Sequence, residues 1–375
     1  MTFEIKHRDD RARTGTLTTD HGVIETPAFM AVGTVGTVKS IEARELAGFG
    51  AQVCLSNAYH LYLRPGTAVL EEMGGLHKFM AWAKPILVDS GGFQVLSLAQ
   101  IRTINEDGVE FRSHIDGSPH MFTPETVVDI QRSIGPDFAM PLDELVGWPV
   151  TREQADHAAE RTWRWLQRAL NHFDETQPLY GHEQTLVPIV QGSFFEDLRK
   201  REAERYAELS HPIYAIGGLA VGEETGKTRE AIDWTTAILP EDRPRYAMGV
   251  GTPDDLLDAV SRGVDLFDCV VPTRNGRRAG LYTFHGRMNL RNAQWAADPR
   301  PVEEDCPCPL CTQYSRAYLR HLFIAGELLA MKLATAHNLT FYYRLLERAR
   351  TEIREGTFNS WLAETSPIIS NPMDR

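Results

Sequence analysis

Residues 264–271 read Val-Asp-Leu-Phe-Asp-Cys-Val-Val, and they are the last of eight apolar runs that decide the fold of this chain. Most of these runs are rich in valine, isoleucine, leucine, phenylalanine and alanine without strict alternation. That composition is typical of strands buried on both faces, as in a parallel sheet. The seven earlier runs are 26–32, 51–57, 86–91, 137–143, 186–191, 213–219 and 245–249.

Helical patterns lie between many of these runs, and eight strands with helical crossovers predict a (β/α)8 barrel. The patterns cover 40–48, 124–134, 151–171, 196–209, 225–239 and 253–262. Thr123 is a candidate N-cap, and Thr151 followed by Gln154 predicts a capping box. The rival is a doubly wound open sheet, but the Gly-x-Gly-x-x-Gly turn that such a sheet carries after its first strand is lacking here. We therefore interpret 1–375 as one α/β domain, an irregular (β/α)8 barrel.

Two stretches interrupt the barrel pattern. Residues 94–121 carry turn signals at Glu106-Asp107-Gly108 and Asp116-Gly117 and predict an inserted β-hairpin. After the eighth run come a basic segment, a cysteine cluster and two helical patterns at 314–330 and 340–355. Residues 366–375 are expected to fray.

Residues 306–311 read Cys-Pro-Cys-Pro-Leu-Cys and hold three of the five cysteines. Three closely spaced thiolates favour Zn²⁺ over Mg²⁺ or Ca²⁺. A histidine is the usual fourth ligand, and both His321 and His337 are candidates. Three cysteines and one histidine would form a closed, structural site. The alternative is a short disulfide loop with one spare thiol.

The composition indicates a cytoplasmic protein. No stretch approaches the roughly 18 uninterrupted apolar residues that a membrane span needs. The N-terminus has no apolar signal core, and cysteines are few. The net charge of −12 argues against a nucleic-acid partner. A local basic patch decides such binding, however, and the average charge does not.

Such a patch lies at 272–291, which contains five arginines and no acidic residue. Glycines and the aromatic residues Tyr282 and Phe284 are interleaved with the arginines. This mixture predicts a loop and hairpin that approach a phosphate backbone. The alternative is a solvated basic turn.

Three carboxylates stand at the ends of predicted strands, where barrels place their active groups. They are Asp89, Asp143 and Asp268. One can act as a nucleophile and another as an acid/base, as in glycosidic-bond chemistry. The alternative makes each aspartate a helix or loop cap.

A flat heterocycle is the ligand that the other strand ends suggest. Gln191 and the backbone of Gly218-Leu219 can supply donors and acceptors to such a ring. Phe93 offers a stacking face and Met248 a polarisable cover. The alternative for Phe93 and Met248 is core packing.

Several motifs together resemble the bacterial tRNA-guanine transglycosylases, also called queuine tRNA-ribosyltransferases. The resemblance runs from about residue 3 to about residue 355. The motifs are Asp89-Ser90-Gly91-Gly92-Phe93-Gln94, Gln191-Gly192-Ser193, Gly217-Gly218-Leu219-Ala220-Val221-Gly222-Glu223, Phe267-Asp268-Cys269-Val270-Val271-Pro272-Thr273-Arg274-Asn275-Gly276-Arg277 and Cys306-x-Cys308-x-x-Cys311.

This resemblance implies a pentosyltransferase that exchanges guanine at the anticodon wobble position for a 7-deazaguanine, in queuosine modification of tRNA. It implies a barrel with a zinc subdomain at about 275–340. Asp268 matches the nucleophile that attacks the ribose, and Asp89 matches the general acid/base. The implied base-binding residues are Ser90, Gly91, Gly92, Phe93, Asp143, Gln191, Gly218, Leu219 and Met248.

The resemblance also implies residues for RNA and for zinc. The RNA-contacting residues would be Gly249, Val250, Gly251, Thr252, Pro253, Asp254, Asp255, Thr273, Arg274, Asn275, Gly276 and Arg277. One structural Zn²⁺ would be held by Cys306, Cys308, Cys311 and His337, which selects His337 over His321. Members of the family are commonly homodimers.

Two positions depart from the family pattern. Many bacterial relatives have cysteine where this chain has Leu145, and queuine-using eukaryotic enzymes tend to have glycine where it has Val221. We therefore expect the incoming base to be the small aminomethyl precursor preQ1. Two other functions remain open. One is a non-catalytic RNA-binding partner subunit, which would not need Asp268 together with Asp89. The other is a small-molecule glycosidase-like barrel, which would not need the arginines or zinc.

Overall fold

The computed structural model describes residues 1–94 and 102–373 of the chain. Its centre is a curled, entirely parallel sheet in the order β11-β10-β6-β5-β4-β15-β14-β13-β12. All eight predicted runs contribute to it. Its strands are β4 (Ala28–Val32), β5 (Cys54–Asn57), β6 (Ile86–Asp89), β10 (Phe138–Ala139), β11 (Thr185–Leu186), β12 (Ile189–Val190), β13 (Tyr214–Ile216), β14 (Arg245–Ala247) and β15 (Leu266–Cys269).

The two edge strands of this sheet are halves of one apolar run, interrupted at Val187 and Pro188. The Val187 amide donates to Ala139 on one side, and the Pro188 carbonyl accepts from Ala215 on the other, both at 2.8 Å. Proline has no N–H to donate to a neighbouring strand. The run is therefore interrupted at Pro188, where its pairing partner changes from β10 to β13. Eight strands therefore close into an irregular barrel, and the predicted fold class is confirmed.

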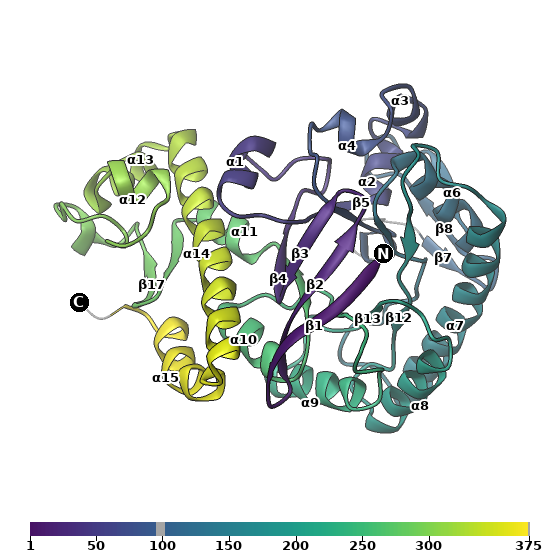
Figure 1. Cartoon of the computed structure of the whole chain (residues 1–375). Helices are drawn as coiled ribbons and strands as arrows, with labels where there is room; N and C mark the ends of the chain where they lie inside the picture. Colours follow the sequence, from purple (N-terminus) through teal and green to yellow (C-terminus); the bar gives the residue numbers. More distant parts are fainter. Residues whose placement is uncertain (95–101, 374–375) are drawn as a thin grey trace.

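Helices surround this barrel (Figure 1). The predicted helices are present as α1 (Ala43–Gly48), α6 (Pro124–Ile134), α7 (Arg152–Glu175), α8 (Glu196–Ala207), α9 (Thr225–Thr236) and α10 (Pro253–Ser261). Thr123 accepts from the Thr126 amide, and Thr151 forms the expected capping box with Gln154. Three short helices follow β5 and were not predicted: α2 (Ala58–Leu63), α3 (Thr67–Glu72) and α4 (Leu76–Phe79).

A three-stranded antiparallel sheet, which was not predicted, precedes the barrel. It consists of β1 (Thr2–Asp9), β2 (Ala12–Thr19) and β3 (Gly22–Thr26). Leu17 and Ile24 from this sheet pack with inward-facing barrel residues such as Met30 and Leu87. The sheet therefore covers the end of the barrel at which the strands begin.

The insertion before α6 has three strands, although a hairpin was predicted for 94–121. They are β7 (Arg102–Ile104), β8 (Val109–Arg112) and β9 (Pro119–Phe122). Asn105 accepts from the amides of Asp107 and Gly108, and Asp116 accepts from the Ser118 amide. Each turn signal therefore joins its own pair of strands. Residues 95–101 of the predicted insertion lie outside the described residues.

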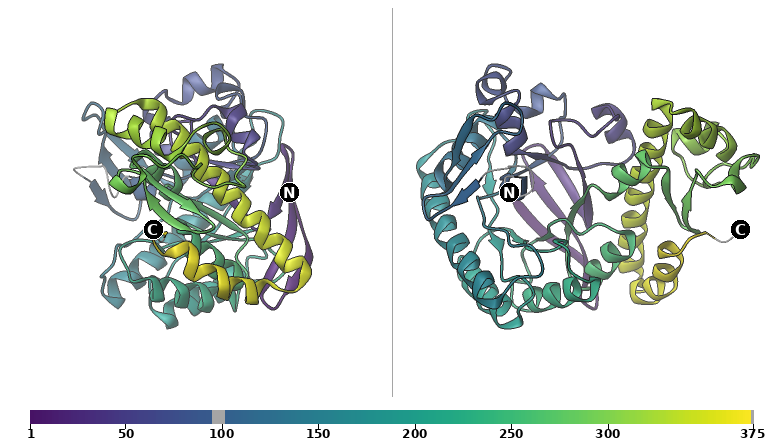
Figure 2. Two further views of the ribbon diagram at one scale, coloured as in Figure 1. Left: turned by 90° about the vertical axis from the view of Figure 1, so that its left-hand side faces the viewer. Right: turned by 180° about the vertical axis from the view of Figure 1, so that it is seen from behind.

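The C-terminal part forms a separate lobe (Figure 2). Its elements are α11 (Val271–Arg277), β16 (Gly280–Thr283), β17 (Gly286–Asn289), a 3-10 turn (Ala293–Trp295), α12 (Pro309–Gln313), α13 (Arg316–Ala325), α14 (Leu328–Glu355) and α15 (Phe358–Ser370). Gly326, at φ 77°, ends α13, so the predicted helix at 314–330 is two helices. The tail is helical to Ser370, although fraying was predicted from residue 366.

The long helix α14 joins this lobe to the barrel. Ala330, Leu333 and Ala334 pack into a core that also contains the three clustered cysteines. From Ala336 onward the same helix packs into the barrel's main core. The same helix therefore contributes to the core of the lobe and to the core of the barrel. No helix of the described residues is both long and apolar enough to span a bilayer.

Candidate active site

A pocket of about 540 Å³ opens where the barrel strands end, and the three predicted carboxylates line it. Asp89 is the last residue of β6, Asp143 follows β10, and Asp268 lies in β15. Active sites of such barrels lie at this face because the loops that follow the strands gather there. The structure therefore brings Asp89, Asp143 and Asp268 into one cavity.

One oxygen of Asp268 is held by two donors. The Tyr246 hydroxyl donates to Oδ1 at 2.6 Å, and the Gly249 amide donates to the same oxygen at 2.8 Å. Burial raises the pKa of Asp268, and these two hydrogen bonds oppose that rise. Oδ2 accepts no hydrogen bond from residues 1–94 or 102–373, so it is the oxygen available to a ligand.

Asp89 lies beside Asn57, its register partner on β5. The Asn57 amide donates to Asp89 Oδ2 at 3.0 Å and to Gln94 at 2.8 Å. Burial, together with the charges of Asp143 and Asp268, raises the pKa of Asp89 to about 7, against the lowering effect of Asn57. Asp89 can therefore give or take a proton near neutral pH. Asn57 was not predicted as a site residue, although it ends a predicted strand.

Asp143 is paired with Gln191, which follows β12. The Gln191 amide donates to Asp143 Oδ2 at 2.7 Å. Burial raises the pKa of Asp143 to about 6, against this hydrogen bond. Asp143 lines the pocket, and Gln191 holds its carboxylate from behind.

The other residues that were predicted to bind the base either line the pocket or lie beside it. Phe93, Gly218, Leu219 and Met248 line the pocket. Phe93 is 50% exposed, so core packing is the wrong interpretation for this side chain. Ser90, Gly91 and Gly92 are buried beside the pocket, where the Ser90 hydroxyl accepts from the Gly92 amide.

Two glycines are required by their backbone conformations. Gly91 has φ +93°, and a Cβ there would lie 2.5 Å from the Tyr59 Cβ. Gly218 has φ +66°, and a Cβ there would lie 2.7 Å from Oε1 of Gln191. Both positions combine a left-handed backbone with close neighbours, so other residues would be strained there.

Arg199 supports the wall of the pocket, and no sequence signal pointed to it. It is fully buried on α8 and donates to the carbonyls of Ser193, Val190 and Gly217. Burial lowers the pKa of Arg199 to about 9. Its guanidinium thus fixes the backbone around Gln191 and Gly218 without facing the cavity.

Leu145 and Val221, the two residues that depart from the family pattern, both line the pocket. Glu223, also a lining residue, accepts hydrogen bonds from the amides of Ala220 and Val221 at 2.7 Å each. No role was predicted for Glu223, although it is the last residue of the motif at 217–223.

The residues predicted to contact RNA lie in different parts of the structure. Of the seven predicted between 249 and 255, five line the pocket, whereas Pro253 and Asp254 begin α10. The five are Gly249, Val250, Gly251, Thr252 and Asp255.

Residues 273–277 lie in α11, although a loop was predicted for the basic segment. Arg274 is exposed and lines the pocket, and Asn275 and Arg277 are half-buried. Thr273 is buried, and Gly276 packs against the α14 backbone. The helix forms here because a Cβ-free residue permits close packing against α14, a contact that the local sequence does not reveal.

The arginines of this segment carry unneutralised charge. Within the described residues, no ion pair involves Arg274, Arg277, Arg278, Arg287 or Arg291. Four of the five are exposed, and Arg274 borders the cavity. The patch is therefore available to an anionic partner although the whole chain is acidic.

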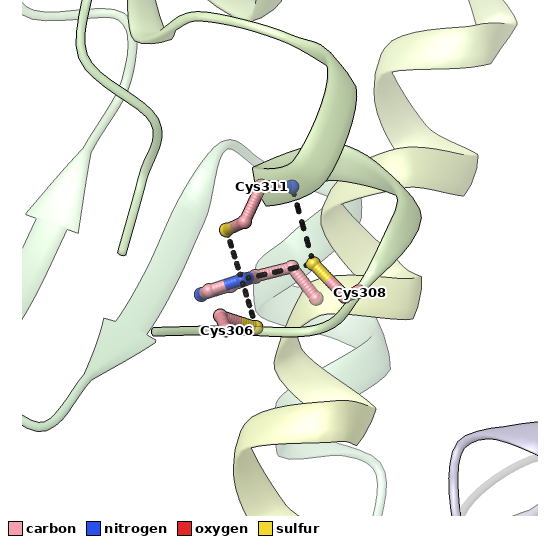
Figure 3. A group of neighbouring side chains, drawn as sticks. Cys306, Cys308 and Cys311 are labelled. Carbon is pink, nitrogen blue, oxygen red and sulfur yellow. Dashed lines mark hydrogen bonds between the residues drawn. The ribbon is translucent and has the colours of Figure 1, made fainter. Parts of the chain in front are cut away.

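The cysteine cluster closes around one histidine of α14. Cys306, Cys308 and Cys311 lie together at the start of α12 (Figure 3), and His337 completes a group whose ligand atoms lie within 4.8 Å of one another. All five cysteines of the chain are free, so the disulfide alternative is wrong. His321 is exposed on α13 and does not belong to the group.

The geometry of this group fits a tetrahedral metal ion. His337 Nε2 donates to the Tyr282 carbonyl at 2.8 Å, which leaves Nδ1 as the free nitrogen. That Nδ1 lies 3.6, 3.5 and 3.3 Å from the sulfurs of Cys306, Cys308 and Cys311. Sulfur and nitrogen on one tetrahedral Zn²⁺ are about 3.6 Å apart. The buried group can therefore hold a metal ion.

Comparison with known proteins agrees with this architecture. The family model described as queuine tRNA-ribosyltransferase matches residues 9–368. A protein of that name from Thermoanaerobacter pseudethanolicus is 51% identical over 355 residues, covering 94% of this chain and 93% of the relative. One from Dictyoglomus turgidum is 49% identical, covering 97% and 94%. One from Solidesulfovibrio magneticus is 50% identical, covering 98% and 97%. A match of this length and identity shows that the chain belongs to the queuine tRNA-ribosyltransferase family.

Proposed function

We propose that this pentosyltransferase exchanges the guanine at the wobble position of a tRNA anticodon for preQ1, the aminomethyl 7-deazaguanine precursor of queuosine. Membership of the family supports the reaction class and the tRNA substrate. The observation that carries the site assignment is the pairing of two aspartates in one pocket. Within the described residues, Oδ2 of Asp268 accepts no hydrogen bond, and burial with the charges of Asp143 and Asp268 raises the pKa of Asp89 to about 7.

In the first step, Oδ2 of Asp268 attacks C1′ of the ribose while the C1′–N9 bond to guanine breaks. Tyr246 and Gly249 hold Oδ1, so the other oxygen faces the sugar. Asp89 donates its proton to the departing guanine. The product is an ester between the RNA and Asp268, and Asp89 is left as a carboxylate.

In the second step, the incoming base occupies the position that guanine has left. Asp89 removes the proton from N9, and that nitrogen attacks C1′ and displaces Asp268. Two displacements at one carbon give net retention, and Asp89 regains its proton. A base must leave its stack to enter such a pocket, where Phe93 and Met248 can cover its faces.

The choice of preQ1 rests on Val221 and Leu145. Both side chains line the pocket and reduce the room that it leaves for a substituent on the base. A small aminomethyl substituent needs less room than the cyclopentenediol group of queuine. Asp143 and Gln191 would read the edge of the purine-like ring, because their hydrogen bond fixes both groups.

The RNA backbone would follow the arginine patch. Arg274 borders the pocket, and the neighbouring exposed arginines form no ion pair within the described residues. Phosphate contacts there would set the register of the anticodon loop without reading its sequence. In this proposal residues 249–252 and the start of α10 approach the sugar side of the target nucleotide.

The Cys306, Cys308, Cys311 and His337 group would hold one Zn²⁺ in a subdomain of about 275–340 inside a single catalytic domain. When bound, this ion supplies folding free energy and no step of the reaction. The lobe has its own core, which supports a metal-stabilised subdomain.

The chain would act as a homodimer in the cytoplasm. Ile324, Leu328 and Leu329 are exposed apolar side chains on the lobe, and Leu328 is 77% exposed. Such a group is typical of a surface that a partner covers. Five free cysteines fit a reducing compartment.

The test is the covalent adduct. Wild-type protein incubated with tRNA should give an RNA–protein band on a denaturing gel and should incorporate labelled guanine. Asp268→Asn should lose both while still binding tRNA, because the amide has the same shape but is a poor nucleophile. Exchange at an undiminished rate in this variant would refute the proposal. A partner subunit would give no adduct, and a small-molecule glycosidase would not need tRNA.

A further inference from the structure

Three histidines gather at the end of the barrel opposite the pocket. His21 lies in the turn between β2 and β3, His77 in α4, and His182 in the segment between α7 and β11. One ring nitrogen of each lies within 4.8 Å of the other two. The side chain of Asp137, buried just before β10, lies among them.

Each ring has one nitrogen committed to a fixed acceptor. His21 Nδ1 lies 2.9 Å from Asp137 Oδ1, and His77 Nδ1 lies 3.0 Å from the Trp82 carbonyl. His182 Nε2 lies 3.1 Å from the Gly135 carbonyl. Carboxylate and carbonyl oxygens can only accept, so these nitrogens carry the protons. The opposite nitrogen of each ring is then the one that can coordinate a metal ion, as in metal-binding histidines whose other nitrogen donates to a carboxylate or a carbonyl.

The second nitrogen of His77, Nε2, is buried next to the carboxylate of Asp137. His77 Nε2 is buried and makes no hydrogen bond within the described part of the chain. It faces Asp137 Oδ2 at 3.3 Å. A cation bound between this nitrogen and the carboxylate would give both of them a partner.

Asp137 supplies the negative charge of this cluster. Its side chain is almost fully buried, with Oδ1 2.9 Å from His21 Nδ1 and Oδ2 3.3 Å from His77 Nε2. The rings of His21 and His77 stack with centroids 3.6 Å apart, and the His182 ring lies edge-on to His21 at 4.4 Å. Three imidazoles beside a buried carboxylate are a donor set that suits a divalent cation.

We propose that His21, His77 and His182, with Asp137 as their anionic partner, bind a divalent transition metal, most suitably Zn²⁺. Imidazole nitrogens suit this class of ion. Nitrogens on one tetrahedral Zn²⁺ are about 3.4 Å apart, so side-chain rotation would close the present spacing.

Such an ion would fasten three segments that are distant in the sequence. The Glu183 amide already donates to Asp20 at 2.8 Å, which joins the His182 segment to the His21 turn. The metal would add α4 to this junction and hold the N-terminal sheet over the closed end of the barrel. Because the catalytic pocket is at the other end, the role would be in stability.

Metal content of the full-length protein tests the proposal. Purified protein equilibrated with Zn²⁺ and passed over a desalting column should carry two zinc ions per chain. His182→Ala and His77→Gln should each carry one, whereas His157→Gln, a substitution of an exposed histidine on α7, should carry two. Cys308→Ala should also retain one.

Cobalt substitution identifies which site is filled. In the Cys308→Ala background, Co²⁺ should give ligand-field bands without the intense thiolate charge-transfer absorption, and His182→Ala should abolish those bands. One zinc per wild-type chain at saturating Zn²⁺, or two in His182→Ala, would overturn the proposal. In the first case the cluster would be a proton-bridged hydrogen-bond network. Since wild-type stoichiometry decides the question, a variant that fails to fold does not remove the test.

Discussion

The hydroxyl of Tyr246 lies 2.6 Å from Oδ1 of Asp268, across the neighbouring strands β14 and β15. The two residues are 22 positions apart in the chain. Because Oδ1 is held in this way, Oδ2, which accepts no hydrogen bond from the part of the chain that the structure describes, is the oxygen that can approach a ligand. The contact also opposes the rise that burial causes in the pKa of Asp268.

Tyr246→Phe should slow formation of the RNA adduct about 10- to 150-fold, with little change in tRNA binding. A hydrogen bond to a charged group contributes about 1.5–3 kcal/mol. Without it, the pKa of Asp268 rises further, so the loss should be greater at low pH. Single-turnover gel assays would measure the rate. Tyr343→Phe is the matched control, because the buried Tyr343 hydroxyl has no hydrogen-bond partner in the described residues. Equal rates in the two variants would contradict the assignment.

The rate of adduct formation should fall as the pH rises through about 7, because the protonated form of Asp89 is needed to release guanine. Asn57→Ser should move this fall in rate to higher pH. The Asn57 amide stabilises the charged carboxylate, so its removal raises the pKa of Asp89. Serine keeps the N-cap of α2, which Asn57 now provides. An unmoved midpoint in a single-turnover pH profile would show that Asp89 does not control this step.

Val221→Gly should raise the use of queuine relative to preQ1. The substitution removes a branched side chain from the pocket lining, and one or two methylene groups in a pocket change relative rates about 10- to 200-fold. Competition between the two bases for labelled tRNA would measure the ratio. Leu145→Cys serves as a second lining variant without the added flexibility of glycine. Wild-type protein that uses queuine as fast as preQ1 would contradict the proposal.

Cys308→Ala should lower the melting temperature and remove one metal ion per chain. The loss should exceed the roughly 1 kcal/mol of an average substitution, because the lobe's core depends on the closed site. Folded molecules should still form the RNA adduct. Cys54→Ala is the control for loss of a buried thiol outside the group, and it should keep its metal. Unchanged melting and metal content in Cys308→Ala would refute a structural role.

Much of the fold was readable because strands buried on both faces and capped helices leave local patterns. The eight apolar runs, the Thr123 and Thr151 caps and the cysteine spacing were each visible within a short window. The N-terminal sheet was missed although Thr2–Asp9 alternates in burial, since only part of its inward face is apolar. The loop expected at 273–277 was wrong because packing against α14 outweighed local turn signals.

The amino-acid sequence alone specifies which carboxylates stand at strand ends and which cysteines are close together in the chain, and the resemblance to the family points to His337. The folded chain adds the partners that no pattern indicated, Tyr246 for Asp268 and Asn57 for Asp89, and it brings His337 to the three sulfurs. These contacts join residues 22 to 32 positions apart, and they depend on strand register and on the direction of α14. Local periodicity specifies which face of an element is buried. It does not specify which side chain of another element lies opposite, because that requires the barrel to close.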